Sequence, residues 1–374
     1  MNIEIKTVLT GKEKKEFIGF PYLLHKGNKQ WIAPLRINQK ELFSEQHPFW
    51  KVNKKQFFLA FINKKCVGRI AAFTNIDYES YFKTSTGFFG FLEAIDDVRV
   101  FIALLSKAEE FLKSLGYKTI CGPLNPSIHF ELGVLVKGFE LPPYFMQTYN
   151  KSYYDQYITK YGFIKLKDFF SYKLVTKDFI QTEKMIRVQT FLQKKYEIKI
   201  RTPDLKNFNA EIKIFFELYN NAFVGHWGFS PISWEDFKFL AKDMKMILDK
   251  EMILIAEKNQ VPIAFLLALP NLNEVLSKIK NGYLFPFGFL KLLLSKGNIK
   301  GVRVITVAIK REWEHLGIGS ILYPEIAIRA RRQGYENAEL SWVVEDNIKM
   351  NKISKALGAE VYKCHRLYEK SNEY

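Results

Sequence analysis

The stretch His315-Leu316-Gly317-Ile318-Gly319-Ser320 places two glycines between a run of strand-forming residues, VRVITVAI, and a run with helical character, ILYPEIAIRARRQGY. Glycines at such a junction let a ligand approach the backbone. The first N–H groups of a helix have no partner inside the helix and lie at its positive end. The pattern predicts phosphate binding at Gly317, Ile318, Gly319 and Ser320. A tight turn without a ligand is the alternative.

Few residues of the second half are candidates for a general base. Glu345 follows the next strand-like run, where partial burial would raise the pKa of a carboxyl group toward neutrality. His226 stands in the loop NNAFVGHWGFSP, and an imidazole exchanges protons near neutral pH. We expect Glu345 and His226 as candidate general bases. The alternatives are a solvated strand-end residue for Glu345 and a packing residue beside Trp227 for His226.

A second dense set of turn residues lies in the first half of the chain, in GPLNPSIHFELG at 122–133. Prolines, glycines and Asn125 predict a shaped loop at the end of a strand, where ligands of open sheets bind. Asn125 and Ser127 are therefore candidate substrate-binding residues, and a loop that is only stiffened by proline is the alternative. Glu93, in GFFGFLEAIDD, is either a functional carboxylate of the corresponding strand or a strand-end charge.

The elements that must position these residues occur twice in the same order. IEIKTV begins at residue 3 and YEIKIR at residue 196, and each alternates like a strand. A hairpin pattern follows each of them, with Asn63 or Asn259 in its polar turn. Two helix-then-strand units come later, and their helices end near Gly116 and Gly334.

This repetition predicts two domains, 1–175 and 176–374, joined by a helical bridge at 176–195. Each half reads as strand, helices, hairpin, strand, helix, strand, helix, strand. The mixture of an antiparallel hairpin with parallel crossovers predicts an α/β (α+β) fold in which each domain is a mixed sheet flanked by helices.

The second half resembles the GNAT acyltransferase superfamily. Family members bind the pyrophosphate of acyl-coenzyme A at a Gln/Arg-x-x-Gly-x-Gly/Ala turn after their fourth strand. The chain matches the glycines at Gly317 and Gly319 but has Glu314 at the first position. The resemblance implies that the backbone of Val307, Ala308 and Ile309 meets the thioester. It also places Asn347 in the substrate site after the fifth strand, and Ser354 where many members carry a tyrosine acid.

The first half lacks the glycine turn and looks like a degenerate GNAT-like domain. The whole chain is similar to duplicated bacterial GNAT-like proteins in segments such as HPFW, GPLNPS and WVVEDN, and some of that group look like bacterial ceramide synthases. The resemblance implies a transferase that moves an acyl group from acyl-CoA, acetyl-CoA or an acyl carrier protein to an amine. A long-chain, sphingoid-like amine is one candidate for this acceptor. A non-catalytic lipid- or acyl-CoA-binding protein is the alternative.

Composition sets the remaining expectations. The formal net charge of +17 favours anionic partners. The sequence has no nucleic-acid-binding signature, so we do not expect it to bind nucleic acid. Three scattered cysteines fit neither a disulfide framework nor a metal site, and no metal is expected. The sequence therefore predicts a cytoplasmic protein. Residues 281–297, NGYLFPFGFLKLLLSKG, predict either a peripheral membrane contact on the inner face or a helix packed on the core.

Overall fold

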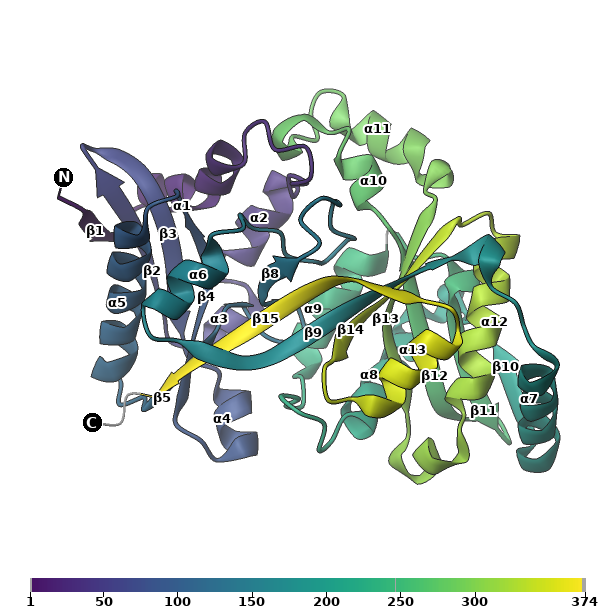
Figure 1. Cartoon of the computed structure of the whole chain (residues 1–374). Coiled ribbons are helices and arrows are strands. Elements are labelled where there is room, and N and C mark those ends of the chain that lie inside the picture. Colours follow the sequence, from purple (N-terminus) through teal and green to yellow (C-terminus); the bar gives the residue numbers. More distant parts are fainter. Residues whose placement is uncertain (1, 246, 372–374) are drawn as a thin grey trace. The chain divides into compact units, whose positions relative to one another are not determined.

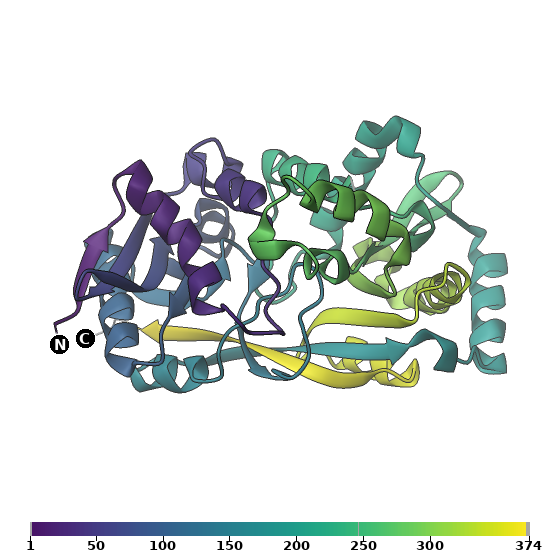
Figure 2. The ribbon, with the colours of Figure 1, turned by 90° about the horizontal axis from the view of Figure 1, so that it is seen from above.

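A computed structural model describes residues 2–245 and 247–371, and the chain forms two compact units (Figure 1). Unit 1 comprises the described residues of Met1–Asp168, Leu276–Lys291 and Lys363–Tyr374. Unit 2 comprises those of Phe169–Val275 and Leu292–Tyr362. Both ends of the described chain belong to unit 1 (Figures 1 and 2).

Unit 1 follows the order expected for the first half. Its elements are β1 Glu4–Thr7, α1 Gly11–Leu24, α2 Arg36–Leu42, α3 Pro48–Val52, β2 Lys55–Ile62, β3 Lys65–Phe73, α4 Ile76–Phe82, β4 Thr86–Ala94, α5 Val98–Ser114, β5 Thr119–Gly122, β6 Leu124–Asn125, β7 Glu131–Leu132, β8 Val134–Lys137, α6 Tyr154–Lys160 and the first residues of β9 Ile164–Val175.

The sheet of unit 1 has the order β1-β2-β3-β4-β5-β15, where β15 is Glu360–Ser371 at the end of the chain. Neighbouring strands are antiparallel except for the parallel pair β4–β5. This is the mixed sheet that the sequence predicts.

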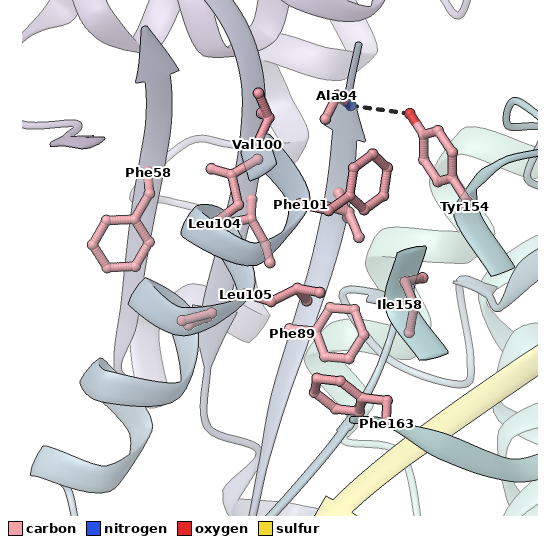
Figure 3. Packing of buried hydrophobic residues seen from close by; sticks show 14 of the residues in the cluster. Phe58, Phe89, Ala94, Val100, Phe101, Leu104, Leu105, Tyr154, Ile158 and Phe163 are labelled. Atoms are coloured by element: carbon pink, nitrogen blue, oxygen red, sulfur yellow. Dashed lines mark hydrogen bonds between the residues drawn. The ribbon is translucent and has the colours of Figure 1, made fainter. Parts of the chain in front are cut away.

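Side chains that alternate along β2 build two hydrophobic layers. Phe58 packs with α5 in a cluster that includes Phe101 and Leu104 (Figure 3). Tyr154 of α6 joins this cluster, and its hydroxyl accepts a hydrogen bond from the Ala94 N–H at 3.1 Å. Phe57, on the opposite face, contacts Phe17 of α1 and the rings of α3. Helices therefore cover both faces of the sheet.

Unit 2 repeats the plan with longer insertions. Its elements are α7 Glu183–Tyr196, β10 Ile198–Arg201, α8 Phe208–Ala222, α9 Trp234–Lys245, β11 Ile253–Lys258, β12 Val261–Pro270, α10 Asn273–Leu276, α11 Gly288–Ser295, β13 Gly301–Ile309, α12 Gly319–Arg332, β14 Asn337–Val344 and α13 Ile348–Ala356. α10 and α11 lie in the part of the chain where the division between the units falls. The helix α7 begins inside the stretch 176–195 that the sequence predicts as a helical bridge, and it ends one residue after that stretch.

The sheet of unit 2 has the order β10-β11-β12-β13-β14-β9 and the same directions, with β13–β14 as its parallel pair. The last strand of each sheet comes from the other half of the sequence. Phe169–Val175 of β9 pairs with β14, and Tyr368–Ser371 of β15 pairs with β5. The two units thus exchange their closing strands, a feature that the sequence repeat does not reveal.

Candidate functional site

The strands β13 and β14 separate within unit 2, which leaves backbone available to a ligand. Their parallel pairing runs only from Gly301–Asn337 to Val304–Leu340, although both strands continue. The register between β12 and β13 shifts at the same level, so that Ile305 is an extra residue in β13. Val307, Ala308 and Ile309 therefore have a partner strand on one side only among the described residues, as the resemblance to GNAT proteins implies.

The glycine turn lies between this part of β13 and α12. Arg311–Leu316 form a short 3-10 helix, Gly317 has a φ of 74°, and α12 begins at Gly319. Within the part of the chain that the structure describes, the N–H groups of Gly317, Ile318 and Gly319 donate to no acceptor. Such a group of free N–H donors at the start of a helix is suited to an anion.

The structure brings His226 to this turn. His226 Nε2 lies 4.0 Å from the Glu314 carboxylate, and both side chains are partly exposed. The loop that carries His226 is held there because the Arg311 N–H donates to Asn221 Oδ1 at 3.2 Å. Lys349 at the start of α13 donates its Nζ to the Glu314 carbonyl oxygen at 3.0 Å. A positive side chain, that of Lys349, thus accompanies the acidic residue at the motif position.

Several side chains in the segment after β14 form hydrogen bonds with backbone groups. Asn347 caps α13, and its side-chain oxygen accepts from the Met350 N–H at 3.0 Å. Glu345 is half-buried in the turn that precedes this cap, and its carbonyl oxygen accepts from the Asn351 side chain. Ser354 is fully buried and donates to the Met350 carbonyl oxygen at 3.0 Å, so its hydroxyl faces its own helix.

Thr306 is a candidate that sequence reasoning missed. It directly follows the extra residue Ile305 on the part of β13 that has left β14. Its Oγ1 is buried and has no hydrogen-bond partner among the described residues. A buried hydroxyl without a partner costs free energy, on the order of 1 to 3 kcal/mol. A polar group of a ligand would satisfy it. Only the strand register reveals this position, because one threonine in a strand has no sequence signal.

A buried charged cluster fixes the two strands just before they separate. The guanidinium of Arg303 on β13 lies 3.3 Å from the Glu339 carboxylate on β14 and donates to Ser341 Oγ at 2.8 Å. Tyr362 donates its hydroxyl to the same carboxylate. Because an unpaired buried charge is costly, this cluster holds the parallel pair in one register and sets the place where the gap begins.

The corresponding position in unit 1 is filled by the chain itself. β4 pairs with β5 only over Thr86–Phe88, but the next turn of chain then enters the gap. Asn125 Oδ1 accepts from the Phe91 N–H at 2.7 Å. A Cβ on Gly90 would lie 1.6 Å from the Leu124 carbonyl oxygen, which shows how closely this segment approaches β4. Asn125 is thus bound to the backbone within unit 1.

The helix after this strand also lacks an anion site. Asp97 caps α5, and its carboxylate accepts from the Arg99 N–H at 2.9 Å. A negative side chain therefore occupies the place that the glycine turn leaves open in unit 2. Ser127 is buried, and its hydroxyl accepts from the His129 N–H at 3.3 Å. Among the described residues of unit 1, the chain's own side chains thus occupy the strand gap and the start of this helix.

Two further observations concern the surface and the cysteines. Among the described residues, no helix combines the length and apolar character that crossing a bilayer requires. Among the described residues, Cys66, Cys121 and Cys364 form no disulfide bond. Burial raises the pKa of the Cys66 and Cys121 thiols to about 12, which makes them poor nucleophiles at neutral pH.

Comparisons with solved structures agree with this architecture. A tandem GNAT protein from the clavulanic acid biosynthesis pathway matches over 100% of this chain and 99% of its own, with a TM-score of 0.56 and 11% identity. The GCN5-related glucosamine N-acetyltransferase region of a fungal multi-domain β-N-acetylglucosaminidase matches 99% of this chain, with a TM-score of 0.58 and 13% identity. The match spans 38% of that longer protein. Both likenesses show the fold.

Curated relatives are similar over the whole chain. Protein YghO of Escherichia coli is 33% identical over 373 residues, which cover 98% of this chain and 95% of the relative. The bacterial ceramide synthase of Caulobacter vibrioides is 32% identical over 381 aligned positions, which cover 99% of this chain and 98% of the relative. No family model matches. With the duplicated fold and full-length similarity both present, the chain belongs to the family of tandem GNAT-fold bacterial proteins that contains these two relatives.

Proposed function

We propose that the protein is an N-acyltransferase that uses an acyl-CoA thioester, and that the reaction takes place in unit 2. The observation that carries this proposal is the set of free N–H groups at Gly317, Ile318 and Gly319, next to the place where β13 leaves β14. The first feature suits the diphosphate of coenzyme A, and the second suits its extended arm and thioester.

The proposed reaction is direct attack of an amine on the thioester carbonyl. The backbone of Val307, Ala308 and Ile309 would orient the acyl group, and Glu345 or His226 would take the proton that the ammonium loses. Ser354 is not available as an acid for the departing thiolate because its hydroxyl is bonded inside α13. The coenzyme A thiolate therefore leaves without a proton, or it takes a proton from a donor other than Ser354.

The proposed acceptor is an amine of the sphingoid type. The Caulobacter relative is named a ceramide synthase, and a ceramide is a sphingoid base with an acylated amino group. Asn125, Ser127 and Asn347 remain predicted substrate contacts, although their side-chain oxygens accept backbone hydrogen bonds in the absence of a ligand.

Acyl transfer can be tested directly. The purified chain is incubated with labelled acyl-CoA thioesters of several lengths and with sphinganine or short amines as acceptors. We expect release of free coenzyme A together with an N-acylated product. A folded sample that neither binds acyl-CoA nor releases the thiol would overturn the proposal.

A matched pair of variants tests the glycine turn itself. Both Asp and Asn tolerate the left-handed conformation of Gly317, and a Cβ there has open space, with Ser320 Oγ the nearest atom at 3.8 Å. Gly317→Asp adds a negative charge beside the free N–H groups, whereas Gly317→Asn has the same shape without charge. We expect the Asp variant to bind acyl-CoA about tenfold or more weakly than the Asn variant. Equal affinities would show that no diphosphate binds there.

A non-catalytic binding protein is the second candidate function. Two residues favour this candidate. Glu314 stands where the superfamily has Gln or Arg, and Ser354, whose hydroxyl is bonded inside its own helix, stands where many members have a tyrosine acid. This candidate predicts that acyl-CoA binds, with the same difference between the two Gly317 variants, but that no thiol is released with any amine.

We also propose that residues 281–297 contact an anionic membrane surface on the cytoplasmic side. Phe285 is 82% exposed, Phe287 68% and Leu294 78%. The segment follows Lys280 and contains Lys291, whose Nζ donates to the carbonyl oxygen of Lys278, just before the segment. Exposed aromatic rings among basic residues are typical of an interfacial segment, and the net charge of +17 would add attraction to anionic lipid.

Vesicle sedimentation tests this contact. We expect binding to vesicles with anionic lipid that weakens with salt and falls at least severalfold when Phe285 and Phe287 are both replaced by Ser. Leu9→Ser is the matched control, because Leu9 is 81% exposed elsewhere on the chain. If the double variant and the control bind vesicles equally, the segment does not enter the membrane surface.

A further inference from the structure

Unit 1 contains a buried group of titratable side chains that the proposed reaction does not use. His25 at the end of α1 places its Nε2 3.1 Å from the Glu93 carboxylate on β4. Tyr154 of α6 donates its hydroxyl to the same carboxylate oxygen at 2.7 Å. The buried guanidinium of Arg69 on β3 stands opposite Glu93 in the sheet. Side chains from three elements of unit 1 therefore surround a carboxylate that β4 carries.

The contacts assign the hydrogen between His25 and Glu93. Burial opposes the charge of Glu93, but the His25 ring, Arg69 and the Tyr154 hydroxyl outweigh it and lower the pKa of the carboxyl group. An ionised carboxylate can only accept hydrogen bonds, so the hydrogen between the two side chains belongs to Nε2 of His25. When Nε2 carries the ring's single hydrogen, Nδ1 has the lone pair and is an acceptor.

This acceptor has no partner. The His25 side chain is 0% exposed, and Nδ1 makes no hydrogen bond to any residue that the structure describes. The ring stacks on Trp31 at 4.9 Å between centroids, and the Tyr149 ring approaches it edge-on at 6.3 Å. A carboxylate orients this buried ring and an indole stacks on it, but one acceptor nitrogen has no hydrogen bond. This arrangement suits a site where a ligand donates a hydrogen bond.

We propose that His25 and Glu93 form a binding site in unit 1 for the amino or hydroxyl group of an amino alcohol. Nδ1 of His25 accepts the hydrogen bond from the ligand, and Glu93 holds the tautomer that makes this possible. The choice of an amino alcohol rests on the proposed function, whereas the need for a hydrogen-bond donor rests on the geometry alone. Unit 1, whose strand gap is filled by Leu124 and Asn125, thereby keeps a role in substrate recognition.

Nitrogen NMR of the full-length chain with 15N-labelled histidine side chains tests this site without any thioester. His25 is identified through its ring contacts with Trp31. The probes are 2-aminooctane-1,3-diol, octane-1,3-diol and octylamine. We expect His25 to be the Nε2–H tautomer and its Nδ1 signal to move upfield with at least one probe, and the arms show whether the amine or a hydroxyl donates. An unmoved Nδ1 signal with all three probes overturns the proposal.

Two variants separate binding from folding. His25→Gln should weaken binding of the aminodiol about tenfold, which is the value of one lost hydrogen bond. His47→Gln removes another buried histidine of unit 1 and should leave that affinity unchanged. If His25→Gln does not fold, the wild-type spectra decide alone.

The result is independent of the transferase assay. A chain that transfers acyl groups but shows no His25 response refutes this site and leaves the proposed function standing. A His25 response in a chain without transfer activity supports the site and counts against the transferase.

Discussion

Thr306 shows how one unsatisfied atom can point to a reaction. Its buried hydroxyl lies where β13 has left β14, next to the backbone that we assign to the thioester. We expect Thr306→Val to lower kcat/KM about tenfold, because the isosteric valine removes one hydrogen bond to the bound thioester. Steady-state kinetics with varied acyl-CoA measure this change.

Thr306→Ser is the control because it keeps the hydroxyl, and it should retain most of the activity. Unchanged kinetics in the valine variant would mean that the hydroxyl has no ligand and that its burial is only a local cost.

His47 provides a pH-dependent prediction at the same scale. Burial, with a smaller effect of Lys55, lowers the pKa of His47 to about 4 from an ordinary value of 6.5. Between about pH 4 and pH 6.5, His47 therefore binds a proton in the unfolded chain but not in the folded chain. The contribution to stability is complete above pH 6.5 and is lost as the pH falls toward 4, by on the order of 3 kcal/mol.

Urea unfolding between pH 7 and pH 4.5 tests this prediction. His47→Gln should lose less stability over this range than the wild type, whereas His315→Gln, which changes an exposed histidine, should behave like the wild type. Equal slopes for His47→Gln and the wild type would refute the assignment.

Residue types and spacing predicted the glycine turn and the nearby His226, but not what individual atoms do. Two glycines between a strand and a helix have a local conformational reason, so their sequence signal is strong. Two contacts join residues that are far apart in the sequence. The Phe91 N–H donates to the Asn125 side chain, and His25 pairs with Glu93. Such contacts depend on the folded sheet, and one sequence contains no record of them.

At the scale of elements, the two hairpins are the clearest evidence of the repeat. Asn63 and Lys64 have φ angles of 50° and 63°, and Asn259 and Gln260 have 49° and 64°. Both turns therefore place two residues in the left-handed region, which is the hairpin turn compatible with twisted strands. The sequence predicted both turns from their asparagines, since asparagine tolerates this conformation better than most residues.

The second turn residue offers a stability test. Lys64 is strained in its left-handed conformation, and glycine adopts it without a Cβ clash. We expect Lys64→Gly to stabilise the chain by up to about 1 kcal/mol in chemical denaturation. Lys65→Gly, one position later in β3, should destabilise it instead, since glycine weakens a strand interior. The opposite order would show that the turn is not under strain.

The closing strands, by contrast, could not be predicted from local pattern. The repeat predicts a last strand in each half, and β9 and β15 are these strands. Their alternation shows that they are strands but does not select a partner edge, because β5 and β14 offer similar edges. The choice depends on tertiary packing, which a repeat with near-equal halves leaves open.

At the scale of the whole molecule, the exchange of strands makes each half depend on the other. The sheet of unit 1 ends with Tyr368–Ser371, and Glu109 of α5 pairs with Lys370 at 2.7 Å. We expect fragments 1–175 and 176–374 to be unfolded or aggregated when expressed separately and to recover native circular dichroism when expressed together. The intact chain is the reference. A separate 1–175 fragment that folds cooperatively would contradict this expectation.

The late position of β15 has a consequence for synthesis on the ribosome. The 245 residues between Gly122 and Tyr368 must be added after β5 before its partner segment is made. During that time the nascent sheet exposes an unpaired edge, the kind of surface from which chains associate wrongly. The growing polypeptide should therefore need a chaperone, or a non-native neighbour, to shield this edge until translation is nearly finished.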